Sequence, residues 1–199
     1  KLITKFYEVN TGNILIDGKD INHYALETLR SKIGVILQDV FLFADTIYNN
    51  ITLFNDDITL ENVENAAKEL EIHDFINSLP GGYSFNVSER GTTLSAGQKQ
   101  LIAFLRVLVN NPDILILDEA TSSIDSYSED LIKNATKKIT KDKTSIIIAH
   151  RLSTIESADK IIYMENGKIL ETGNHKQLLS IPNGKFKKLY EEQFIDELV

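Results

Sequence analysis

Short apolar runs alternate along this chain with stretches of helical periodicity, and this alternation restricts the fold more than any other feature. The strand-like runs are 13–17, 33–38, 113–118, 144–149, 160–164 and 168–171. The helical stretches are 60–70, 98–110, 130–139 and 186–198, with apolar residues every three or four positions. Because the Ile, Val and Leu runs of the later strands are nearly continuous, we expect those strands to be buried on both faces of a parallel sheet. The pattern predicts an α/β fold.

Two further segments refine this prediction. Residues 41–106 are mostly helical and lie between two strands, which predicts a helical insertion into the α/β core. At the amino end, Leu2, Ile3 and Phe6 stand at helical spacing, so we expect the interior of a helix there.

Composition limits the function classes. The chain has 199 residues, of which 42% are hydrophobic and 25% charged, as in a globular protein with a sizeable core. Its 21 basic and 29 acidic residues leave a net charge of -8, which argues against nucleic-acid binding and against adhesion to anionic lipid. The absence of cysteine excludes disulfides and cysteine-based metal sites.

Polar residues follow three of the predicted strands. Gln38, the pair Asp118 and Glu119, and His150 each stand at the carboxyl end of an apolar run. Each one alone is explained as an ordinary polar strand terminus. In a parallel sheet, however, these ends share one edge, which is where α/β sheets bind ligands. The carboxylate of Asp118 suits Mg²⁺, and Glu119 could polarise a water.

The stretch TLSAGQKQL, residues 93–101, predicts a helix start. Ser95 and Gln98 have the spacing of a capping box. Ala96 and Gly97 add little side-chain bulk to the first turn, so an anion could approach its unpaired N–H groups closely. The stretch therefore predicts a helix cap that can also bind phosphate.

Four segments together resemble one family, the ATP-binding-cassette (ABC) ATPases. IGVILQD (33–39) resembles their Q-loop, and LSAGQ (94–98) resembles their signature motif, whose usual form is LSGGQ. ILILDEATSSID (114–125) resembles the Walker B strand with its D-loop, and IIIAHRLST (146–154) the H-loop. LQDVFLFADTIYNNI (37–51) and SERG (88–91) are similar to the exporter branch. The resemblance covers essentially the whole chain, and Ala96 is a mild departure from it.

The resemblance implies a P-loop NTPase (RecA-like) core with a parallel sheet, formed by 1–40 and 107–199, and an inserted α-helical subdomain, 41–106. It implies an ATPase with ATP and Mg²⁺ as ligands, which drives export at the cytoplasmic face of the cell membrane. The implied partners are a second nucleotide-binding domain, in a head-to-tail dimer, and a transmembrane domain. No nucleic acid is expected.

The family pattern also implies residue roles. Asp118 and Gln38 would serve the Mg²⁺ site, Glu119 would be the general base, and His150 would contact the γ-phosphate. Ser95, Gly97 and Gln98 of the signature motif would bind the ATP held by the partner. Asp125 would act across the dimer interface, and Glu89 would help to couple the domain to the membrane domain.

The Walker A P-loop of the family, G-x-x-x-x-G-K-[ST], does not occur in the sequence. Gly-Lys stands only at 18–19, 167–168 and 184–185, each time without the upstream Gly and the following Ser or Thr. We therefore expect the chain to begin just downstream of the P-loop, with the N-terminal β-subdomain and P-loop strand largely missing, and to bind ATP poorly. Two alternatives stay open, a soluble ABC ATPase of DNA repair or translation and a non-catalytic interaction module.

Overall fold

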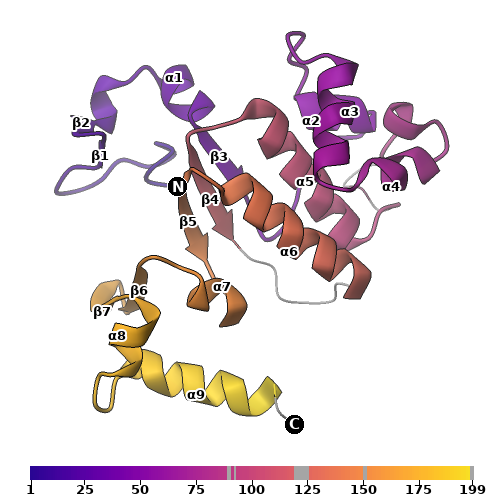
Figure 1. Ribbon diagram of the computed structural model, residues 1–199. Helices are drawn as coiled ribbons and strands as arrows, with labels where there is room; N and C mark the ends of the chain where they lie inside the picture. Colours follow the sequence, from indigo (N-terminus) through magenta and orange to yellow (C-terminus); the bar gives the residue numbers. More distant parts are fainter. Residues whose placement is uncertain (89–90, 92, 119–125, 150–151, 198–199) are drawn as a thin grey trace. The chain divides into compact units, whose positions relative to one another are not determined.

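The computed structural model describes residues 1–88, 91, 93–118, 126–149 and 152–197. The chain divides into two compact units, Lys1–Ile147 and Ile148–Val199, which are described separately. Both units mix strands and helices (Figure 1). None of the helices formed by these described residues combines the length and apolar character that a membrane span requires.

The first unit contains most of the elements that the sequence predicts. The expected helices at 60–70, 98–110 and 130–139 are confirmed, with boundaries that differ by at most four residues. In chain order its elements are β1 (Leu15–Ile16), β2 (Lys19–Asp20), the 3-10 helix η1 (Ile21–His23), α1 (Leu26–Ser31), β3 (Ile33–Ile36), α2 (Ile47–Thr52), α3 (Leu60–Glu69), α4 (His73–Ser78), the 3-10 helix η2 (Gly82–Ser84), α5 (Ala96–Asn110), β4 (Ile114–Asp118), α6 (Ser126–Thr140) and β5 (Thr144–Ile148), whose last residue lies across the boundary.

A three-stranded sheet with the order β3-β4-β5 lies in this unit. β3 and β4 are parallel, and Ile36 is level with Leu117. At the edge where both strands start, the amino edge, the Lys32 carbonyl accepts hydrogen bonds from the amides of Asp113 (3.1 Å) and Ile114 (3.0 Å). These bonds align the two strands, so both end at the opposite, carboxyl edge.

Helix α5 forms the centre of the hydrophobic core. Leu101, Ile102, Phe104 and Leu105 are each at most 2% exposed. Because the helix is apolar on nearly all sides, it must be covered all round. It packs against α2, α3, α6 and β3, and Figure 1 shows α6 lying alongside it. Buried residues of the helical stretch 41–106 belong to the same hydrophobic cluster as Ile36, Leu115 and Leu117 of the sheet.

The second unit contains α7 (Leu152–Glu156), β6 (Ile161–Glu165), β7 (Lys168–Gly173), α8 (His175–Leu179) and α9 (Lys185–Glu197), which confirms the helix expected near 186–198. β6 and β7 form an antiparallel hairpin, so the expectation that the later strands all lie in a parallel sheet is wrong for these two. Asn166 and Gly167 have φ of 52° and 73°, the left-handed geometry of a tight hairpin turn.

The burial expected of these strands is also wrong. Four apolar side chains of the hairpin are 44–61% exposed, namely Ile162, Met164, Ile169 and Leu170. A two-stranded antiparallel hairpin can be open to solvent on one face, whereas a parallel sheet has helices on both. The apolar runs therefore indicated strands correctly but did not indicate how the strands are covered.

The amino end forms a turn instead of the expected helix. The Phe6 amide donates to the Lys1 carbonyl, and the Lys5 amide to the Leu2 carbonyl, both at 3.0 Å. With Lys5 at φ 51°, this pairing is the Schellman pattern that closes helix ends. The apolar spacing of Leu2, Ile3 and Phe6 thus reflects a single helix-closing turn.

Candidate functional site

Gln38 and Asp118 lie at the carboxyl edge of the β3–β4 pair. Asp118 is the last residue of β4 and is half-buried, and Gln38 follows the end of β3 by two residues and is exposed. Since Ile36 is level with Leu117, the register brings Asp118 and Gln38 to neighbouring positions at one edge. A carboxylate and an amide oxygen, both accessible, form a donor set that fits Mg²⁺.

Other residues predicted for this edge lie outside the described part of the chain. They are Glu119, Asp125 and His150, and Glu89 of the SERG stretch is also among them. The arrows of β3, β4 and β5 point the same way in Figure 1, and β5 ends at Ile148.

Ser95 and Gln98 form the predicted capping box at the start of α5. The Gln98 amide donates to Ser95 Oγ at 3.2 Å, and the Ser95 amide donates to Gln98 Oε1 at 2.9 Å. Ser95 and Ala96 are exposed, whereas Gly97 is buried. Since the first-turn amides of a helix have no carbonyl partner within it, this end offers donors beside two small residues.

The direction of α5 separates this cap from the amino edge of the sheet. Asn111 ends the helix with φ 41°, and β4 starts three residues later. Over 15 residues the helix is about 22 Å long, so its cap lies that far from the turn into β4. No hydrogen bond between described residues joins Ser95 or Gln98 to Gln38 or Asp118.

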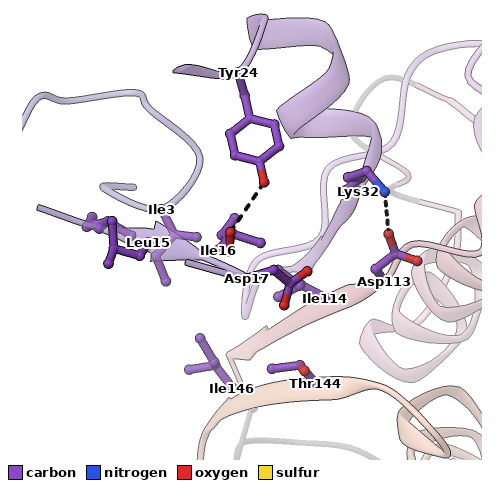
Figure 2. Close-up of a pocket in the computed structure, with 11 residues that line it drawn as sticks. Ile3, Leu15, Ile16, Asp17, Tyr24, Lys32, Asp113, Ile114, Thr144 and Ile146 are labelled. Atoms are coloured by element: carbon purple, nitrogen blue, oxygen red, sulfur yellow. Dashed lines mark hydrogen bonds and ion pairs between the residues drawn. The ribbon is translucent and has the colours of Figure 1, made fainter. Parts of the chain in front are cut away.

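A pocket of about 330 Å³ lies elsewhere, at the amino edge (Figure 2). Ile16, Ile114 and Ile146 give it apolar walls, and Lys32 and Asp113 form an ion pair of 2.7 Å at its rim. The hydrogen bond with Lys32 lowers the pKa of the Asp113 carboxyl and raises that of the Lys32 ammonium. Because Asp113 immediately precedes β4 and Asp118 ends it, this pocket is not at the predicted ligand edge.

Sequence reasoning missed a polar network that bonds the segment following Gln38. Arg106 on α5 donates from Nε to the Asn50 carbonyl at 2.9 Å and from Nη2 to the Phe41 carbonyl at 3.4 Å. Burial lowers the pKa of the Arg106 guanidinium. Asn50 is fully buried. The available signal was an arginine inside an otherwise apolar helix, which requires a partner when it is buried.

Known proteins are similar to this chain over nearly all of its length. The family profile described as ABC transporter matches residues 1–122. A Bacillus subtilis (strain 168) protein named YgaD, whose name describes a multidrug export ATP-binding/permease protein, is 50% identical over 189 residues. A likewise named Staphylococcus aureus (strain NCTC 8325 / PS 47) protein is 50% identical over 192 residues. These matches cover 95% and 96% of this chain.

A solved structure agrees with the sequence comparisons. The structure of a bacterial Atm1-family ABC exporter with ATP bound matches 96% of this chain, with a TM-score of 0.86 and 42% identity. The chain spans about a third of that structure and of the curated relatives, 32–33% of each. The fold is therefore that of an ABC exporter ATP-binding domain, and the chain belongs to the ABC transporter family.

Proposed function

We propose that this chain binds and hydrolyses ATP to drive export across a membrane, as the nucleotide-binding domain of an ABC exporter. The observation that carries the proposal is the position of Gln38 and Asp118 at one edge of a parallel sheet. Sheets of this type bind ligands at that edge. The names of the similar proteins, which combine ATP binding with a permease, support the same function.

At the carboxyl edge we assign Mg²⁺ to Asp118, with Gln38 beside it, since both offer oxygen ligands at neighbouring strand ends. When bound, the ion would neutralise charge on the phosphate oxygens. Glu119 is the proposed general base, which orients the attacking water, and His150 the proposed contact to the γ-phosphate. Catalysis of this kind depends on positioning and on charge stabilisation.

The start of α5 is the proposed site for the partner's nucleotide. Ser95, Gly97 and Gln98 would contact the γ-phosphate of ATP held by a second nucleotide-binding domain in a head-to-tail dimer. The capped first turn with its small residues Ala96 and Gly97 supports this assignment, because a helix N-terminus carries partial positive charge. Asp125 would act across the same interface.

The second proposed partner is a transmembrane domain. Residues 37–51 and Glu89 belong to the exporter-like segments, and we assign the contact to them. In this arrangement residues 41–106 form the helical subdomain, while 1–40 and 107–199 form the core. The domain would lie at the cytoplasmic face of the cell membrane.

Substitution of the proposed base tests this function. In the full-length protein that contains this chain, Glu119→Gln is expected to abolish ATP turnover and retain ATP binding, because the amide cannot accept the proton of the attacking water. Asp113→Asn is a matched control at the other end of β4, which is expected to keep turnover. Near-normal hydrolysis by the Glu119→Gln protein would show that the base is misassigned.

We also propose that these 199 residues alone bind Mg-ATP weakly, because no P-loop motif occurs among them. Backbone amides and a lysine of that motif normally surround the phosphates. Titration calorimetry with the isolated chain is expected to give little or no heat of binding. Micromolar affinity would mean that other residues hold the phosphates and would contradict this proposal.

A further inference from the structure

Two polar side chains bond the segment that follows Gln38, namely Asn50, which is buried, and Arg106, which is half-buried. Asn50 Oδ1 accepts from the Phe43 amide at 2.8 Å. Its Nδ2 donates to the Phe43 and Thr46 carbonyls, both at 3.0 Å, and to the Asp45 carbonyl at 3.3 Å. Asn50 is therefore bonded along the whole stretch 43–46.

Arg106 adds the connection to α5. Its Nε bonds the Asn50 carbonyl, and its Nη2 bonds the Phe41 carbonyl. The Asn50 carbonyl belongs to the last turn of α2, where Leu53 (φ 54°) and Phe54 (φ 62°) turn out of the helix. Carbonyls at such helix ends have no intrahelical donor, so Arg106 supplies one.

This network orders the backbone and leaves the aromatic rings in solvent. Phe41 and Phe43 are 57% and 44% exposed, although the carbonyls of both residues accept hydrogen bonds from Arg106 and Asn50. Their rings contact each other edge to face, with centroids 5.1 Å apart. Burial of these two rings is thus not what fixes the segment. The buried Leu42 side chain holds it to the core, and the polar bonds of Asn50 and Arg106 hold its backbone.

We propose that Arg106 is a positioning residue that fixes the segment after Gln38 to α5. Arg106 lies 11 residues after Ser95, about 16 Å along one continuous helix. The bonds of Arg106 would make Gln38 and the Ser95 cap move as one body. The proposed function brings both of them to ATP phosphates. The inference rests on that function for its consequence, whereas the link itself is a property of the fold.

Hydrogen exchange in the full-length protein that contains this chain tests the link. Arg106→Gln is expected to accelerate exchange of the amides of 41–46 about tenfold or more, because bonds from a charged donor are lost. In Arg106→Lys the lysine can bond at most one of the two carbonyls well, so a smaller increase in the exchange rate of 41–46 is expected. This variant replaces Arg106→Gln in the test if the Gln variant does not fold. Core amides of 101–105 are expected to keep their protection.

Arg30 provides the matched control. It also donates to two main-chain carbonyls, those of Thr4 (3.2 Å) and Lys5 (3.5 Å), from the short helix α1. Arg30→Lys is expected to leave exchange at 41–46 unchanged. Unchanged exchange at 41–46 in both Arg106 variants would overturn the proposal, and so would equal acceleration of segment and core, which indicates a general folding role.

Kinetics supply the second measurement. Arg106→Lys is expected to lower kcat for ATP with little change in KM, since ATP contacts remain and only the relative placement of the two groups changes. Arg30→Lys is expected to change neither value. A wild-type protein without ATPase activity would defeat the proposed function but leave the exchange test valid. Normal kcat in the Arg106→Lys protein would defeat this inference alone.

Discussion

Ser95 and Gln98 hydrogen-bond each other in both directions at the first turn of α5, at 3.2 and 2.9 Å. The reciprocal bonds occupy the amides of both residues and fix the backbone between them. Ala96 and Gly97, which lie between, have no bulky side chain over the first turn. The same four residues thus form a structural cap with little side-chain bulk over its first turn, in which Gly97 is buried.

Removal of this cap is expected to reduce both stability and activity. Ser95→Ala should lower the free energy of unfolding by about 1 kcal/mol, because the Gln98 amide loses its acceptor. In the full-length protein it should also lower ATP turnover, because the proposed phosphate contact is removed. Denaturant unfolding and steady-state ATPase assays measure the two effects.

A second capping box separates the two effects. Asn174 and Gln177 form the same reciprocal pair at α8, each bond 2.9 Å long, and lie outside the proposed site. Asn174→Ala is expected to cause a similar loss of stability with ATP turnover retained. Equal loss of turnover in both variants would show that Ser95 acts only as a cap.

The packing of Gly34 predicts a strong effect of one added methyl group. A Cβ at this position would lie 2.7 Å from Pro112 Cγ and 3.0 Å from Leu115 Cδ2. Gly34→Ala is therefore expected to destabilise the chain by about 1–3 kcal/mol through overpacking. Chemical denaturation followed by circular dichroism measures this loss.

A compensating substitution checks the cause. Pro112→Ala removes the atom nearest to the added methyl group, so the double variant Gly34→Ala/Pro112→Ala is expected to regain part of the lost stability relative to Pro112→Ala alone. If the two effects simply add, the contact with Pro112 is not the source of the strain.

The ion pair of Lys32 and Asp113 predicts a pH dependence. The lowered pKa of Asp113 contributes stability above its ordinary value of 3.8, and this stability is lost as pH falls through the folded-state pKa. The raised pKa of Lys32 contributes below 10.5, and this contribution is lost as pH rises through its folded-state pKa. Between these limits the pair is intact.

Direct titration tests this pair. The Asp113 carboxyl, followed by NMR, is expected to titrate below 3.8 in the wild type and to return toward that value in Lys32→Met. Because both side chains are exposed, 1 M NaCl should weaken the effect. A carboxyl pKa that is the same in both proteins would contradict the observed hydrogen bond.

Local sequence patterns predicted the elements well where one physical cause dominates. Ser95 and Gln98 showed the start of α5, because a capping box involves only neighbouring residues. The strand 113–118 and helix 60–70 follow from periodicity and appear as β4 and α3. The hairpin of β6 and β7 was misplaced in a parallel sheet, although Asn166-Gly167 is a typical hairpin turn.

The candidate site was predicted in part. Gln38 and Asp118 were correctly expected at a common sheet edge, since the ends of parallel strands meet there. Asn50 and Arg106 were not expected as partners, because 56 residues separate them and no local pattern relates a buried arginine to main-chain carbonyls. The functional roles of Gln38, Asp118, Ser95, Gly97 and Gln98 stay predictions.

The sequence by itself determined the family, the α/β element types and the capped start of α5, because these depend on motifs and on residues close together in the chain. The tertiary structure decided which side chains meet across long separations. It placed Arg106 against the Asn50 and Phe41 carbonyls and exposed the apolar hairpin of β6 and β7. Such contacts depend on how helices and strands pack, and packing is set by the whole chain at once.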